Sequence, residues 1–216
     1  MRRRRIPRLE SFLEDFEDML KGLEPGTMPP AYTGGMTLEG VWNLYDFVEA
    51  GGTLVAMDNA SELPLTTFGL PVRDVTQGLR ESEFYVPGSI LRVRLDPTHP
   101  VAYGMPRDAG GFFVHSAAFA VGRAPSRWEQ WTATRPAAPD AITVVGSYAS
   151  SDLLMSGWVM GERVIAGRSA ILHARVGRGQ VVLLGFRVQH RGQPHGTFKL
   201  LFNSLFLGAY AGTTSQ

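Results

Sequence analysis

The 216-residue sequence contains no cysteine. That absence excludes disulfides, thiolate metal sites and every mechanism with a cysteine nucleophile. An excess of charge of one sign is also missing, because 21 Lys and Arg residues stand against 20 Asp and Glu residues. The overall charge therefore gives no case for a nucleic-acid partner. No segment approaches the roughly 18 consecutive apolar residues that cross a bilayer, so no membrane span is expected.

The first residues lack the apolar segment of an export signal. Arginines at positions 2–5 resemble the charged start of such a signal, but an acidic segment follows them. Apolar residues at three- and four-residue spacing predict an amphipathic helix over 9–21. We expect the arginines to form a solvated tail ahead of this helix, the alternative being a nucleic-acid patch. No signal peptide is identified, and no compartment is assigned.

The segment after the prolines near position 30 has the pattern of half a doubly wound unit. An amphipathic helix is predicted over 37–50, with Thr37 as its N-cap and a glycine pair as its stop. The continuous apolar run at 53–58 predicts a buried parallel strand. A polar turn follows, in which Ser61 can cap a short helix. Helix, glycine turn and buried strand in this order indicate an α/β fold.

Later segments are richer in strand patterns. The clearest is a hairpin over 170–176 and 180–186, whose turn is bounded by glycines. Other apolar segments predict further strands at 89–95, 112–121 and 142–148, and a final helix is predicted at 197–210.

Several segments resemble one family when they are taken in order. They are 25–35 (PGTMPPAYTGG), 47–56 (FVEAGGTLVA), 68–73 (FGLPVR), 84–92 (FYVPGSILR), 96–100 (DPTHP), 103–106 (YGMP) and 186–203. Together they are similar to the class I glutamine amidotransferase-like domain that follows the catalytic domain in a group of bacterial zinc carboxypeptidases. The resemblance covers about residues 25–210. It implies a flavodoxin-like, amidotransferase-like doubly wound sheet over 25–211, between a basic tail with a helix (1–24) and a short tail (212–216).

Two departures from that family affect what the resemblance implies. No apolar strand precedes Pro25, so we expect the sheet to lack two of its first strands. The peptidase domain is absent, which suggests a truncated or altered reading frame, or a piece that completes itself with another chain. The related full-length enzymes look exported, to the periplasm or outside the cell, and their zinc belongs to the parent peptidase domain.

The chemistry of both parent families is missing from this sequence. Zinc carboxypeptidases hold their metal with a pattern that starts His-x-x-Glu, and none of the five histidines has Glu three residues later. We therefore expect no metal and no cofactor on this chain. The elbow that carries the amidotransferase cysteine corresponds to residues 58–61, and without cysteine glutaminase chemistry is excluded. Glycines do not flank Ser61, which favours helix capping over a serine nucleophile.

A polar loop at 187–196 is the best candidate for a functional site. It follows a predicted strand and precedes a helix, where α/β sheets bind ligands, and the turn after strand 53–58 belongs to the same edge. The loop could hold an anion or a sugar, or it could cap the helix and fasten the loop. The candidate ligand-binding residues are Asp58, Asn59, Arg187, His190, Arg191 and His195.

Three hypotheses for function follow. The first is a non-catalytic accessory domain that packs on a zinc peptidase domain, in cis or in trans, or presents substrate to it. The second is a carbohydrate- or anion-binding module of amidotransferase-like fold, with a peptide as a further possible ligand. The third is an independent hydrolase using Ser61 with His190 or His195, which requires a Ser–His hydrogen bond.

Overall fold

The computed structural model describes residues 35–122 and 142–213. Contacts divide the chain into two compact units, residues 1–46 and 47–216. The helix predicted at 9–21, the arginine tail, the missing first strands and the predicted boundary at residue 24 all lie outside the described residues.

The first described helix, α2 (Leu38–Glu49), confirms the helix predicted at 37–50. Thr37 caps it as predicted, because the amide nitrogen of Gly40 donates to Thr37 Oγ1 at 3.2 Å. The chain leaves the helix at Gly51, whose φ of 121° is open to glycine and strained for other residues.

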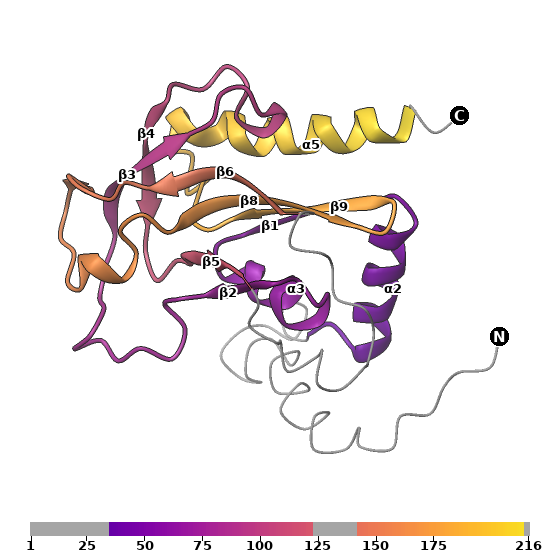
Figure 1. Cartoon of the computed structure of the whole chain (residues 1–216), viewed down its shortest axis with the longest axis horizontal. Helices are drawn as coiled ribbons and strands as arrows, with labels where there is room; N and C mark the ends of the chain where they lie inside the picture. Colours follow the sequence, from indigo (N-terminus) through magenta and orange to yellow (C-terminus); the bar gives the residue numbers. More distant parts are fainter. Residues whose placement is uncertain (1–34, 123–141, 214–216) are drawn as a thin grey trace. The chain divides into compact units, whose positions relative to one another are not determined.

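The described residues of the second unit form a nine-stranded sheet, which confirms the α/β class (Figure 1). Its main order is β1 (Thr53–Met57), β9 (Gly179–Leu184), β8 (Ser169–Val176), β6 (Ile142–Tyr148), β3 (Ser89–Leu95) and β4 (Asp108–Phe113). Three short strands attach beside this path: β2 (Val72–Asp74), β5 (Phe119–Val121) and β7 (Leu154–Ser156). Strands β1 and β9 run parallel, as in doubly wound sheets, and the other described pairs are antiparallel.

The local strand predictions hold where the pattern was clear. The hairpin near the C-terminus is confirmed: β8 and β9 pair from Val176↔Gly179 onward, around a two-residue turn that contains Gly177 at φ 58°. Strands β3 and β6 also occupy their predicted ranges.

Two strand predictions need correction. The single strand predicted at 112–121 is wrong, because β4 ends at Phe113 and β5 begins at Phe119. His115 lies between them at φ 48°, a conformation that no strand contains. Strand β1 is parallel as predicted but not fully buried, since only Ala56 among its residues is buried. Among the described strands β1 ends the order, so only β9 flanks it.

Helices and short 3₁₀ turns complete the second unit. Figure 1 shows α5 (Phe198–Thr213) and α3 (Glu62–Thr67) on opposite sides of β8 and β9. The turns are η2 (Asp58–Ser61), η3 (Pro100–Ala102), η5 (Glu162–Val164) and η6 (His195–Thr197). The core between these elements is apolar, and its largest fully buried side chains include Tyr148, Phe113, Phe119 and Phe186.

Candidate functional site

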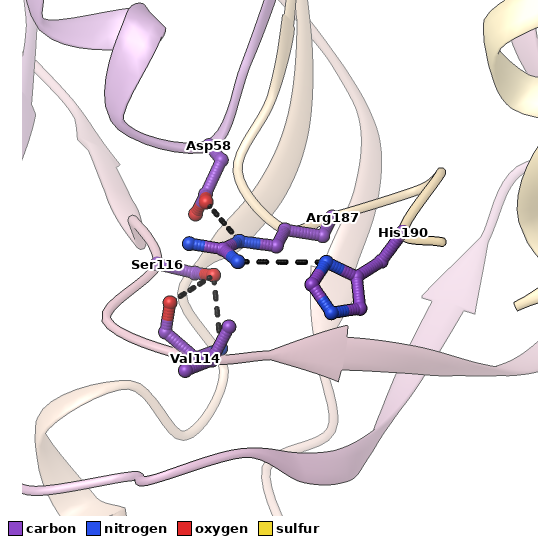
Figure 2. A network of polar contacts seen from close by, with 5 residues as sticks. All are labelled: Asp58, Val114, Ser116, Arg187 and His190. Atoms are coloured by element: carbon purple, nitrogen blue, oxygen red, sulfur yellow. Dashed lines mark hydrogen bonds and ion pairs between the residues drawn. The ribbon is translucent and has the colours of Figure 1, made fainter. Parts of the chain in front are cut away.

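The candidate site lies where the two parallel strands end. Their pairing finishes at Met57↔Leu184, so Asp58 and Arg187 both follow the carboxyl edge of the sheet. Arg187 Nε donates a hydrogen bond to Asp58 Oδ2 at 2.6 Å, and the two side chains form an ion pair (Figure 2). The structure thus brings together two of the residues that the sequence placed at one edge, 129 positions apart.

Asp58 occupies a conformation that costs free energy. Its φ of 58° lies in the left-handed region, which costs a non-glycine residue about 1 kcal/mol or more. The residue is 8% exposed, and its second carboxylate oxygen, Oδ1, has no hydrogen-bond partner. A buried polar atom without a partner costs roughly 1–3 kcal/mol. Both costs fall on the turn that joins β1 to α3.

Ser61 adds a second unpartnered polar atom to the same turn. It is 1% exposed, and its Oγ makes no hydrogen bond. The predicted capping of α3 by this side chain is therefore wrong, because the backbone at Ser61 is already helical and the hydroxyl makes no cap bond. The Ser–His hydrogen bond that the hydrolase hypothesis requires is equally missing in the described part of the chain.

Arg187 is fixed from its other side by the loop after β9 and by β4. Its Nη1 lies 3.5 Å from His190 Nδ1, and its backbone nitrogen donates to Phe112 O at 3.1 Å. The His190 ring packs against the Phe112 ring with 4.9 Å between centroids. Figure 2 shows the guanidinium between Asp58 and the turn that carries Val114 and Ser116. In that turn Ser116 Oγ accepts from the Val114 nitrogen at 3.1 Å.

The other predicted site residues lie apart from this ion pair. Asn59 and Arg191 are exposed, and His195 bonds to the carbonyl oxygen of Gly192. In the part of the chain that the structure describes, none of the three shares a hydrogen bond or ion pair with Asp58 or Arg187.

An aromatic row that no sequence pattern indicates begins at the turn next to the site. His115 is exposed, and its ring lies 6.0 Å from that of Tyr85. Tyr85 in turn lies 5.8 Å from Trp158, which is half exposed. No local pattern in the sequence links these three residues, since each comes from a different loop; it is the exposure of Trp158 in the folded chain that draws attention to them.

A second polar cluster lies away from this edge, around His99 and His173. The Val101 nitrogen donates to His99 Nδ1 at 3.2 Å, so the proton of the neutral ring is on Nε2. That Nε2 lies 3.2 Å from His173 Nδ1, and His173 Nε2 lies 2.8 Å from Gln180 Oε1. Gln180 Nε2 then donates to Thr53 Oγ1 at 3.0 Å. In this relay of His99, His173, Gln180 and Thr53, each hydrogen-bond donor faces an acceptor only while both imidazole rings are neutral.

Burial lowers the pKa of both histidines. For His99 the cost of desolvating the charged ring comes first and the charge of His173 second, while Asp96 acts in the opposite direction. For His173 desolvation again comes first, opposed by its hydrogen bond to Gln180 and supported by the charge of Arg175.

The described residues contain neither a metal-ligating cluster nor a helix that could span a membrane. They contain no group of three His, Asp or Glu side chains that could hold a metal ion. Within the same residues no helix is both long and apolar enough to cross a membrane. The polar groups at the edge of the sheet include one buried carboxylate, one guanidinium, one imidazole and the buried hydroxyl of Ser61.

No family model and no curated protein matches the sequence, so the resemblance to the peptidase-associated domain stays a prediction. The fold is similar to that of several solved proteins. A β-galactosidase from Bacillus circulans sp. alkalophilus matches 90% of this chain at 11% identity, with a TM-score of 0.44. This chain spans only 22% of that enzyme's length.

Smaller proteins match as well. A GMP synthase-like protein from Thermoplasma acidophilum matches 83% of this chain and 69% of its own, at 10% identity and a TM-score of 0.48. A ThuA-like protein from Bacteroides uniformis matches 79% of this chain and 63% of its own, at 14% identity and a TM-score of 0.43.

Proposed function

We propose that this chain is a non-catalytic accessory domain that works by packing on a catalytic domain of the zinc carboxypeptidase class. The observation that carries the proposal is an exposed apolar stripe along α5. Phe202, Leu205 and Phe206 are 53%, 54% and 72% exposed, at the three- and four-residue spacing of one helix face. Contiguous exposed apolar surface of this kind is typical of a site that a partner covers.

The opposite side of α5 is fully engaged within its own unit. Leu200 and Ser204 are buried, and the Asn203 amide donates to carbonyl oxygens of Val101 and Tyr103 at 3.0 and 2.9 Å. The helix is therefore anchored on one side and presents apolar rings on the other. A rigid helix with this division is suited to docking.

The missing chemistry supports a role without catalysis. The turn that would carry the amidotransferase cysteine begins with Asp58, whose carboxylate is buried and paired with Arg187. Ser61 in the same turn has no histidine as hydrogen-bond partner.

Sedimentation velocity of the full chain mixed with a bacterial zinc carboxypeptidase catalytic domain tests the proposal. A 1:1 complex is expected at micromolar concentrations, and the double variant Leu205→Lys, Phe206→Glu should weaken it at least tenfold. Met155→Glu, which alters an exposed apolar residue (47% exposed) in β7, is the matched control and should bind normally. Independent sedimentation of the two wild-type proteins at 50–100 µM, roughly the limit of a weak specific interface, would refute the proposal.

A further inference from the structure

We infer that the turn Asp58–Ser61, together with Arg187, is a binding site for a neutral ring with several hydroxyl groups, such as a pyranose sugar. None of these residues belongs to the stripe on α5, so ligand binding here is independent of docking. Two unpartnered polar atoms, Asp58 Oδ1 and Ser61 Oγ, lie in residues that are more than nine-tenths buried. Native proteins leave few buried polar atoms unpaired, and such atoms gather at sites where a ligand supplies the partner.

The charges at the site decide the class of ligand. Asp58 and Arg187 form an ion pair at 2.6 Å, so the guanidinium is neutralised before any ligand arrives. An anion such as phosphate would gain from Arg187 and lose nearly as much from the adjacent carboxylate. A neutral ligand is not repelled by the Asp58 carboxylate.

The hydrogen-bonding groups fit vicinal hydroxyls. The Asp58 carboxylate offers only acceptor capacity, the Arg187 guanidinium only donors, and Ser61 Oγ both. Adjacent hydroxyls on a sugar ring can donate to the carboxylate while they accept from the guanidinium. Arg187 is a third exposed, whereas Asp58 Oδ1 is covered. A ligand therefore meets the Arg187 guanidinium first, and its contact with Oδ1 requires the turn to open.

The aromatic row supplies the apolar part of the site. His115 directly precedes Ser116, which Figure 2 shows beside the Arg187 guanidinium, and the row continues through Tyr85 to Trp158. One face of a pyranose presents C–H groups, which pack well on the electron-rich face of an aromatic ring. Polar groups that orient a ligand beside aromatic side chains are the usual composition of small-molecule sites.

Titration of the full-length chain by calorimetry and ligand-observed NMR tests the inference. The probes are D-glucose, D-galactose and methyl β-D-galactopyranoside, with inorganic phosphate as the anion probe. At least one sugar should bind the wild type with millimolar or better affinity, and phosphate should bind far more weakly. Asp58→Asn should weaken the sugar at least tenfold and strengthen phosphate, because Arg187 then loses its counter-ion.

Further variants keep the test independent of the folding of Asp58→Asn. Ser61→Ala should weaken the sugar severalfold, and so should Trp158→Ala; Tyr103→Ala, which removes an exposed aromatic from the segment after η3, should not. If no sugar binds the folded wild type at 20 mM, or if phosphate binds it better than every sugar, the inference is wrong. A chain that binds no sugar but still docks through the α5 stripe would leave the proposed accessory role unaffected. A chain that binds sugar but does not dock would refute the accessory role and leave the sugar site unaffected.

Discussion

Mild acid should destabilise the folded chain through His99 and His173. Both rings have a lowered pKa in the folded state, while a histidine in the unfolded chain titrates near 6.5. Above that pH both rings are neutral in either state and the relay is intact. Below it the unfolded chain takes up protons that the folded chain resists. The free energy of unfolding therefore falls as the pH drops from 6.5 towards the lowered folded values.

The size of this loss in unfolding free energy depends on the number of histidines that stay neutral in the folded chain. A single histidine that stays neutral on folding contributes up to about 1.4 kcal/mol per pH unit below its unfolded pKa. Both rings keep contact with water, and screening reduces this figure to roughly half. Because the unfolded rings are only half protonated at pH 6.5, the two together should cost at most about 1 kcal/mol between pH 6.5 and 5.5. Protonation would also set His99 Nδ1–H against the N–H of Val101, so that both groups are donors.

Urea unfolding followed by far-ultraviolet circular dichroism at pH 7.5, 6.5 and 5.5 measures this loss. His173→Gln removes one titrating ring and should show about half of the wild-type decrease. His195→Gln, at an exposed histidine outside the relay, serves as the control and should retain the full decrease. A wild-type stability that is constant from pH 6.5 to 5.5, or an equal decrease in His173→Gln, would refute the reasoning.

Two further predictions, for serine and for glycine positions, are both read by thermal and urea unfolding. Ser61→Ala should stabilise the ligand-free chain by about 1 kcal/mol, because it removes a buried hydroxyl without a partner, whereas Ser204→Ala should cost about 1 kcal/mol by losing the bond to the carbonyl four residues earlier. Equal losses in both would mean that Ser61 has a partner. Gly161→Ala should cost about 3 kcal/mol, because its new Cβ would collide with the carbonyl oxygen of Glu83. Gly192→Ala has a similar positive φ, but its new Cβ would meet no atom within 4 Å, so it should cost only about 1 kcal/mol. Similar losses in both variants would show that backbone strain alone, without the collision, determines the loss of stability.

Local patterns in the sequence predicted much of the sheet. Strand β3 was found because alternating apolar residues at 89–95 match a half-buried strand, and the hairpin because glycines bound its turn. The edge location of Asp58 and Arg187 followed from the same logic, since each comes after a strand of the parallel pair.

Long-range pairing and backbone strain could not be predicted in this way. The break between β4 and β5 depends on one residue, His115, in the left-handed region, and no neighbouring glycine or proline signals it. His99 meets His173 across 74 positions, a contact that no local pattern in the sequence encodes. Ser61 fits the pattern of a cap, but the backbone turns helical one residue too early for its hydroxyl to reach an amide.

The parallel pairing of β1 with β9 has a kinetic consequence. The β8–β9 hairpin closes over two residues, whereas β1 pairs with β9 across 127 positions, at Thr53↔Gln180. Contacts this distant in sequence form late in folding, and the strand at the end of a sheet, which is β1 among the described strands, opens first in the native state. The amides of β1 should then exchange with solvent faster than those of β8. The Asp58–Arg187 pair fastens the far end of this late strand, so a ligand bound there would slow hydrogen exchange along all of β1.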